Sequence, residues 1–178
     1  TGALVVVDIG VPPHLADAVQ TFVLNADLVR QWLPVRPNVS HKGTFGKLMA
    51  AVGSMNYPGA AYLSCAAAGR VGAGLLTGAV VQPVWNVVAG RLAEPTWVIL
   101  PTGADNENGV IDASAAPVIV SALKGYSALL LGCGLGQKPT TQQFVQNLLS
   151  QPELPATLID ADGLNCLAKL ENWPKRLP

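Results

Sequence analysis

Residues 40–61 read SHKGTFGKLMAAVGSMNYPGAA. Within them the run Leu48–Val52 is short, apolar and uncharged, which is typical of a strand buried on both faces of a parallel sheet. Gly53 ends the run, and Pro58 suits the first position of a helix, where the missing N–H of proline is not needed. The stretch therefore predicts a strand, a turn and a helix, in that order.

This stretch also begins a long part of the chain with very little charge. After Lys47 the only charged residue before Arg91 is Arg70, and a membrane-spanning helix needs only about 20 apolar residues. However, residues that break helices interrupt both uncharged segments, at 56–59 and repeatedly at 72–83. Their backbone groups would lack hydrogen bonds in lipid. We therefore expect no contact with a membrane and interpret the apolar residues as a buried core.

The composition agrees with heavy burial. Of the 178 residues, 50% are apolar and 12% are charged, about half the charged share of roughly 25% in an average globular protein. Such a composition fits either a fold whose elements are buried on both faces or a chain taken from a larger protein. Eleven basic and eleven acidic side chains cancel, so no net charge favours binding to nucleic acid.

The cysteines and histidines do not form a site. Cys65, Cys133 and Cys166 are odd in number, lie far apart and lack zinc-site spacing, so we expect reduced thiols in a cytoplasmic protein. Cys133 has no basic neighbour that would activate it as a nucleophile. His14 and His41 are isolated, and we interpret both as surface or packing residues.

Strand-like and helix-like segments alternate through the rest of the chain, at intervals of roughly 25 to 30 residues that are typical of βαβ units. The sequence therefore predicts an α/β fold with a mostly parallel sheet flanked by helices. Further strands are expected at 75–81, 97–100, 128–131 and 157–159, and helices at 58–74, 85–92, 113–123, 139–149 and 164–170.

The first part of the chain differs in character. TGALVVVDIGVPP at 1–13 predicts a strand with an abrupt stop, and residues 25–40 predict a short capped helix and a linker that contains proline. We expect a boundary between Pro37 and His41, which separates residues 1–39 from 40–178. Because the chain ends where another strand is expected, the fold is also expected to be incomplete at its C-terminal end.

Two turns that follow predicted strands are candidates for ligand binding, because the carboxyl edge of an open α/β sheet forms its crevice. In GSMNYPGA at 53–60, Gly59 lets a ligand approach the N-terminus of a helix. In GCGLG at 132–136, alternating glycines can approach a phosphate or a planar ring, although they match neither the dinucleotide fingerprint nor the P-loop. A plain structural turn is the alternative for both.

A third turn, DADGLN at 160–165, brings two acids to the same edge. The carboxylates of Asp160 and Asp162 are costly to bury without hydrogen-bond donors or a cation. One of them can serve as the N-cap of the following helix, but two acids and Asn165 exceed what a cap requires. We therefore expect at least one acid to contact a ligand or Mg²⁺.

Together these stretches resemble the ADP/ATP-dependent NAD(P)H-hydrate dehydratases. The motifs SHKGTFGKLMAAVGSMNYPGAAYLSCAAAGRVGAGLLT, LLLGCGLG and LIDADGLNCLAK occur in the order of that family, across about residues 40–178. Cys133 stands where the family usually has Pro, which could alter the rigidity of the turn, and Gly163 stands where it usually has Ala. Residues 1–39 resemble the end of the NAD(P)H-hydrate epimerase domain of two-domain members, and no epimerase activity is expected from them.

The resemblance implies a ribokinase-like fold and a repair reaction. Hydrated NADH or NADPH is dehydrated at the expense of ATP or ADP, with Mg²⁺ expected beside the nucleotide. By motif, Gly59 and Ala60 line the hydrate site, the glycine turn approaches the dinucleotide, and the acidic turn faces the nicotinamide or the phosphoryl-transfer centre. The substrate-binding residues implied in this way are Gly59, Ala60, Gly132, Gly134, Gly136, Asp160, Asp162 and Asn165.

The family also has a Thr-Pro-His-Pro-Gly-Glu segment and a Gly-Thr-Gly-Asp turn whose Asp is the expected catalytic base. Neither occurs in these 178 residues, so the catalytic Asp is expected beyond Pro178. We therefore expect this chain to supply the substrate-side part of a site that a following segment, another chain or a second copy in a homo-oligomer completes. Alone it is expected to be inactive. A small-molecule kinase of the same fold and a non-catalytic nucleotide-binding module are the alternatives.

Overall fold

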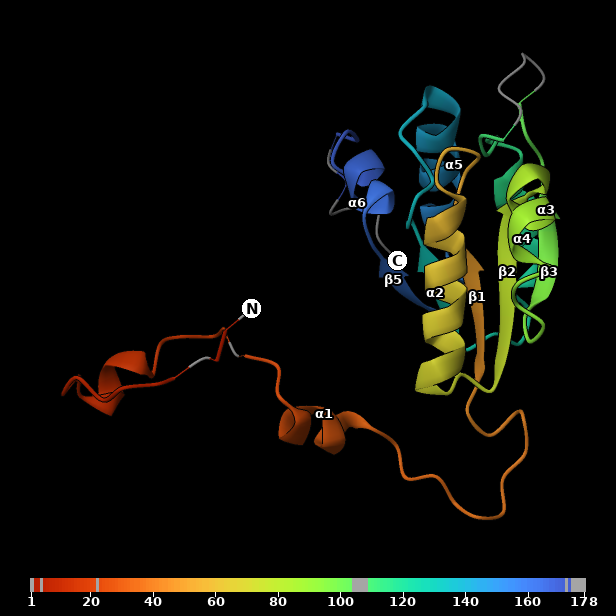
Figure 1. Cartoon of the computed structure of the whole chain (residues 1–178). Helices are drawn as coiled ribbons and strands as arrows, with labels where there is room; N and C mark the ends of the chain where they lie inside the picture. The colour runs from red at the N-terminus through yellow and green to blue at the C-terminus, as the bar shows by residue number, and fades with distance from the viewer. Residues whose placement is uncertain (1, 4, 22, 104–108, 172, 174–178) are drawn as a thin grey trace. The chain divides into compact units, whose positions relative to one another are not determined.

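The computed structural model describes residues 2–3, 5–21, 23–103, 109–171 and 173. The chain divides into two compact units, residues 1–38 and 39–178, and each is described by itself (Figure 1). Within the described ranges, no helix is long and apolar enough to cross a membrane.

The first unit contains one short 3-10 helix, η1 (Pro13–Ala16), and the helix α1 (Ala26–Trp32), and neither buries a residue. Asn25 caps α1 by accepting a hydrogen bond from the N–H of Leu28 at 2.9 Å, as the predicted capped helix requires. The strand predicted at 1–13 is wrong for the described residues, where Val6 is 90% exposed. A single extended segment without a neighbouring strand has no partner for its backbone groups.

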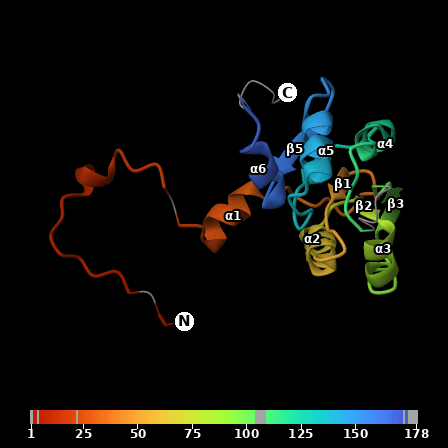
Figure 2. The same ribbon diagram turned by 90° about the horizontal axis from the view of Figure 1, so that it is seen from above.

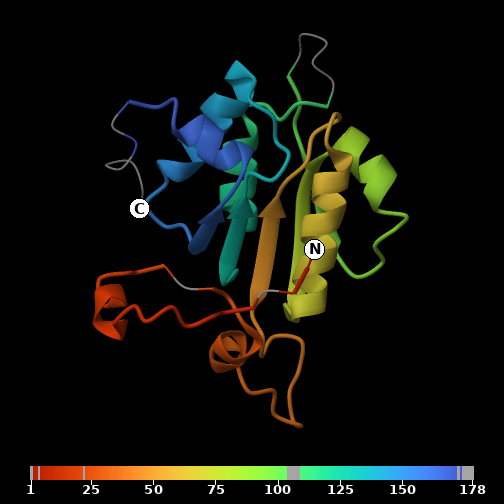
Figure 3. The same ribbon diagram turned by 60° about the vertical axis from the view of Figure 1, so that its left-hand side comes forward.

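The second unit is built on a five-stranded parallel sheet in the order β3-β2-β1-β4-β5. Figure 3 shows β5, β4 and β1 of this sheet side by side. The predicted α/β fold is thereby confirmed, and each strand lies within one residue of its predicted position. The bounds are β1 (Lys47–Ala51), β2 (Leu75–Val81), β3 (Thr96–Leu100), β4 (Ala128–Leu131) and β5 (Ala156–Ile159).

Helices cover the sheet from both sides. Viewed from above, α2 and α3 lie on one face and α4 and α5 on the other (Figure 2), as right-handed crossovers in opposite directions from β1 require. The bounds are α2 (Pro58–Val71), α3 (Gln82–Val88), α4 (Ala115–Ala122), α5 (Pro139–Leu149) and α6 (Asp162–Leu167).

Two helix predictions need correction. The helix expected at 85–92 is α3, which begins directly after β2 and includes Pro83 in its first turn, because proline is tolerated where no N–H bond is needed. The helix expected at 164–170 is α6, which begins two residues earlier, at Asp162. Both shifts bring a helix start closer to the carboxyl edge of the sheet.

The core is centred on β1. Met49, Ala50 and Ala51 are completely buried, since β1 is the middle strand and has helices on both faces. Close packing extends to the edge of the sheet, where a Cβ on Gly78 would lie 2.4 Å from the indole ring of Trp97. This rigid centre fixes the starting points of the loops that follow β1 and β4.

The order of the strands reverses direction at β1, which pairs with β2 on one side and with β4 on the other. The loop after β1 leads to a helix on one face, and the loop after β4 leads to a helix on the opposite face. Ligands of open α/β sheets bind in the crevice that opens at such a switch point. The fold therefore directs attention to the loops at the carboxyl ends of β1, β4 and β5.

Candidate functional site

The loops that follow β1 and β4 are joined by hydrogen bonds. The N–H of Gly53 donates to the carbonyl of Cys133 at 2.8 Å, and the hydroxyl of Ser54 donates to the carbonyl of Gly134 at 2.9 Å. Ser54 is buried, so this bond also satisfies a polar group that water does not reach. The two loops therefore form one continuous rim.

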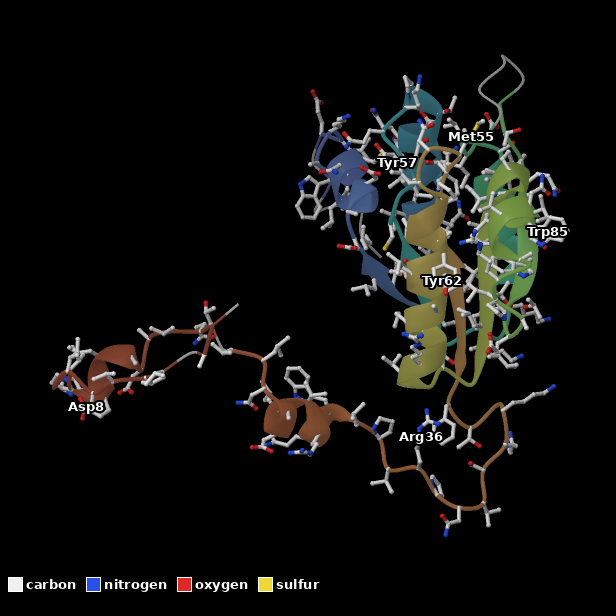
Figure 4. All side chains as sticks on the ribbon, viewed as in Figure 1. Asp8, Arg36, Met55, Tyr57, Tyr62 and Trp85 are labelled. Atoms are coloured by element: carbon white, nitrogen blue, oxygen red, sulfur yellow. The ribbon has the colours of Figure 1, made fainter. Side chains whose placement is uncertain are left out.

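At this rim, Gly134 packs against the start of α2. Its φ is +69°, and a Cβ there would lie 2.5 Å from the Cβ of Ala60 and 2.9 Å from that of Tyr57. Figure 4 shows Tyr57 at the end of the sheet where α2 begins. The space next to Gly59 is open. Gly59, Ala60 and Gly134, which the motifs implied as substrate-binding residues, thus lie together.

Backbone donors at this place are available to a ligand. Among the described residues, the N–H groups of Gly59 and Gly134 make no hydrogen bond. Gly59 is the second residue of α2, where the helix dipole also favours negative charge. The arrangement can accept a phosphate, a carboxamide oxygen or a hydroxyl oxygen.

Gly132 has a structural role instead. It is buried with a φ of +129°, and a Cβ there would lie 2.0 Å from the carbonyl oxygen of Asp160. No ligand is needed to explain glycine at this position, because the turn after β5 occupies the space. Gly136 differs, since the space beside it is open, but its N–H is already bonded to the carboxylate of Asp162 at 2.9 Å.

The carboxylate of Asp162 connects α6 to the loop after β4. Besides Gly136, it accepts hydrogen bonds from Gln137 Nε2 at 3.0 Å and from Asn165 Nδ2 at 3.2 Å. Burial alone would raise the pKa of Asp162, but these three donors and the charge of Lys169 outweigh it and lower the pKa. Asp162 is therefore held as an anion by groups of the protein.

Asp160 has different surroundings. Its carboxylate is exposed and accepts one weak hydrogen bond, from the thiol of Cys133 at 3.4 Å. Ala161, which lies between the two acids, has φ +47° and ψ −116°, a conformation that non-glycine residues rarely adopt. Backbone strain of this kind clusters at functional sites, where the surrounding structure holds it in place.

The interpretation of either acid as an N-cap is wrong. Ala161 is the N-cap of α6 and makes no side-chain cap, while Asp162 is the first helical residue. A carboxylate at the first turn still interacts favourably with the helix dipole. However, its hydrogen bonds to Gly136 and Gln137 run across the rim to another loop.

The thiols of the site are not nucleophiles. Burial is the main cause that raises the pKa of Cys133, and burial likewise raises the pKa of Cys166 to about 11, so neither is a thiolate near neutral pH. The thiol of Cys166 instead contacts the carbonyl of Gly136 at 3.7 Å. His14 and His41 are exposed, as predicted, and His41 accepts a hydrogen bond from the N–H of Gly43 in the turn before β1.

A groove of about 690 Å³ lies beside the site, between α2 and the strands β1, β4 and β5. Its lining is mostly apolar, from residues such as Ala67, Leu130 and Leu158, with Asp160 and Ser64 among the few polar groups. Both faces of a parallel sheet are normally covered by helices. We therefore interpret the groove as a bare face of the sheet and place the candidate site at the loops above it.

Sequence reasoning found most of this rim but missed its connecting side chains. Ser54 and Gln137 join one loop to another, and Lys169 donates to Gln137 Oε1 at 3.0 Å. Both connecting residues are polar and directly adjoin a glycine of the predicted turns, which is the signal that could have identified them. Lys169 carries no comparable signal, because it is one more charged residue of an exposed helix end.

The carboxylates of the rim differ in their room for Mg²⁺. No group of three or more His, Cys, Asp or Glu side chains gathers within the described ranges, and both oxygens of Asp162 are engaged by protein donors. Mg²⁺ usually takes one or two carboxylates and keeps phosphate and water ligands. Asp160 is the carboxylate at the rim that has room for such a contact.

The fold and rim define the class of the protein. A ribokinase-like superfamily protein from Enterococcus faecalis superposes with a TM-score of 0.67 at 23% identity, over 82% of this chain and 47% of that one. The ADP/ATP-dependent NAD(P)H-hydrate dehydratase from Bacillus subtilis, co-crystallised with ATP/Mg²⁺, superposes with a TM-score of 0.57 at 27% identity, over 78% and 45%. The second unit therefore has a ribokinase-like α/β fold.

The particular family follows from the sequence. Residues 48–177 match the pattern that defines the NAD(P)H-hydrate dehydratase family. The bifunctional NAD(P)H-hydrate repair enzyme of Moorella thermoacetica is 37% identical over 171 residues, which are 94% of this chain and 31% of that protein. The chain belongs to the NAD(P)H-hydrate dehydratase family. It spans about a third of the length of the bifunctional relatives that it matches.

Proposed function

We propose that this chain supplies the substrate-side part of an ATP- or ADP-dependent NAD(P)H-hydrate dehydratase, which returns hydrated NADH or NADPH to the intact dinucleotide. The observation that carries the proposal is the single rim formed by the loops after β1, β4 and β5 in a chain of this family. This rim offers backbone donors, glycines with open space beside them and an exposed carboxylate to one small molecule.

The proposed roles follow from the surroundings of each residue. Gly59, Ala60 and Gly134 line the hydrate, because free N–H groups and an open surface occur together there. Asp160 accepts a hydrogen bond from a substrate donor. Gly132, Gly136, Asp162 and Asn165 hold the loops in the shape that this contact requires.

The nucleotide supplies the driving force. Hydroxide is a poor leaving group, so transfer of a phosphoryl group to the added hydroxyl lets phosphate depart instead, while the ring loses a proton. Binding at the rim orients the hydrated ring for this transfer. We propose that the nucleotide arrives with Mg²⁺, which would neutralise phosphate charge during the transfer and which the exposed carboxylate of Asp160 has room to contact.

The test is to incubate the complete protein with hydrated NADPH and either ATP or ADP. Recovery of NADPH absorbance, dependent on the nucleotide, supports the proposal. Phosphorylation of a small alcohol without any action on hydrated NADPH would favour a kinase of the same fold. Stabilisation by NADPH or ATP without turnover of either substrate would favour a non-catalytic binding module.

Location and assembly are part of the same proposal. The free thiols Cys65, Cys133 and Cys166 support a cytoplasmic protein. The bare face beside the rim supports completion of the site by further protein, either in the same polypeptide or in a second copy. The mass of the assembly in solution, measured on the complete protein, decides between them.

A further inference from the structure

The two acids beside Ala161 are not equivalent. Asp162 is half-buried, and each of its oxygens already has a protein donor, Gly136 on one and both Gln137 and Asn165 on the other. A carboxylate accepts about four hydrogen bonds at most, in fixed directions. Little capacity is left on Asp162 for a ligand.

Asp160 has the opposite environment. Its carboxylate is exposed, and its contact is a thiol, which is a weak donor. It lines the end of the groove that lies nearest the rim, together with Cys133 and Ser64. A substrate hydroxyl or carboxamide N–H can replace the thiol there without displacing any strong protein interaction.

We propose different roles for the two acids: Asp162 is a positioning residue that holds the loop 132–138, and Asp160 is the carboxylate that contacts the substrate. The strained backbone of Ala161 turns the two side chains toward these different neighbours. The proposal rests on the proposed dehydratase function for the identity of the substrate, whereas the positioning role of Asp162 stands on the hydrogen bonds alone.

The positioning effect reaches the ligand through the backbone. Asp162 anchors the N–H of Gly136, two residues from the free N–H of Gly134, while Ser54 anchors the carbonyl of Gly134. Glycines with positive φ give this loop alternative conformations. These two anchors after the free donor, and the bond from the N–H of Gly53 to the carbonyl of Cys133 before it, select one of these conformations.

Gln137 makes the inference testable, because the orientation of its amide is set from both sides. Its Nε2 donates to Asp162 Oδ1, and its Oε1 accepts from Lys169 at 3.0 Å. In Asp162→Asn, the new amide keeps its oxygen toward the N–H of Gly136 only by turning its NH₂ toward the NH₂ groups of Gln137 and Asn165. Asn165 is exposed and can rotate to accept, but rotating Gln137 would turn its NH₂ toward the ammonium of Lys169. Adding Gln137→Glu restores a matched pair, in which Glu accepts from the new Asn and from Lys169.

The experiment compares these variants in the complete protein, with turnover of hydrated NADPH and melting temperature as readouts. Asp162→Asn alone is expected to lose about tenfold or more in kcat/KM, the usual effect of one charge-assisted hydrogen bond. The double variant Asp162→Asn with Gln137→Glu is expected to regain most of that loss and the melting temperature. No rescue of kcat/KM, despite a restored melting temperature, would show that Asp162 itself contacts the substrate and would overturn the proposal.

Asp160→Asn completes the test. It is expected to lower kcat/KM by about tenfold or more, to leave the melting temperature unchanged, and to gain nothing from Gln137→Glu. Glu153→Gln, an exposed acid outside the rim, is the matched control and is expected to change neither readout. Full activity in Asp160→Asn would also overturn the assignment.

These outcomes are separate from failure of the proposed function. A wild-type protein that does not act on hydrated NADPH would count against the dehydratase activity. In that case the recovery of melting temperature in the double variant still decides the role of Asp162, and stabilisation by NADPH, compared between wild type and Asp160→Asn, decides that of Asp160.

Discussion

At the scale of single residues, the glycines of the turn after β4 have different roles although they alternate regularly in sequence. The space that a side chain would occupy is filled at Gly132 by the backbone of the turn after β5 and at Gly134 by the start of α2. At Gly136 that space is open. A pattern of glycines indicates where the backbone bends. Only the neighbouring segments show whether protein or ligand fills the space.

Gly132→Ala is therefore expected to destabilise the fold strongly. The new Cβ would clash with the carbonyl of Asp160 in a backbone conformation that disfavours alanine, and we expect a loss of about 3 kcal/mol or more in the free energy of unfolding. Chemical denaturation measures it. Gly59→Ala is the control, since a helical position with open space should keep or raise stability. Equal effects of the two changes would contradict the model of loop packing.

The pKa of Asp162 also leads to a prediction. Because the folded state lowers this pKa below its ordinary value of 3.8, the stabilising contribution is fully present above that value and is lost as pH falls through the folded pKa. The wild type is expected to melt at a higher temperature than Asp162→Asn near neutral pH, with the difference shrinking in acid. Melting curves of both proteins across the acid range measure this. A difference that grows in acid would contradict it.

At the scale of elements, α5 lies on the face of the sheet opposite α2 and buries Phe144 completely. Phe144→Ala removes a large side chain from this packed face, and about 3 to 5 kcal/mol of unfolding free energy should be lost. Gln143→Ala on the exposed side of the same helix is the control and should cost little. Both changes introduce alanine, the strongest helix former, so a loss of stability in urea that is confined to Phe144→Ala is a loss of packing.

The strands were predictable because burial on both faces leaves continuous apolar runs such as 48–52 and 128–131. Helix starts were less predictable, since Pro83 and Asp162 are compatible with a turn as well as with a first helical residue. The segment at 5–9 is apolar enough for a strand, yet strand formation depends on a neighbour that the sequence of the segment does not reveal.

The site was predictable only in part for the same reason. Parallel strands bring their carboxyl ends to one edge, so the sequence already placed Gly59, Gly134 and Asp160 on one rim. The division between Asp160 and Asp162 was not accessible, because it depends on Gly136 and Gln137, which lie 26 and 25 residues away from Asp162 in the chain. Contacts of that range arise from the fold and leave no local pattern.

At the scale of the whole molecule, the two units should differ in resistance to proteolysis. The described residues of 1–38 bury no side chain and form only η1 and α1, whereas the second unit has a packed parallel sheet. Brief digestion with trypsin is expected to cut first within 1–38, at Arg30. Mass spectrometry of the products identifies the cuts, and first cleavage within β1–β4 would contradict the expectation.

The position of β1 at the centre of the sheet also has a consequence for synthesis on the ribosome. Leu48 pairs with Leu76, which follows soon after it, and with Ala128, which is translated much later. Likewise, the N–H of Lys47 donates to the hydroxyl of Ser127, which lies 80 residues further along the chain. A nascent chain therefore carries an apolar middle strand with one unpaired edge while the segments before β4 emerge. Because translation is vectorial, the exposed edge of this strand is the first place where a chaperone or a wrong partner strand can bind the chain.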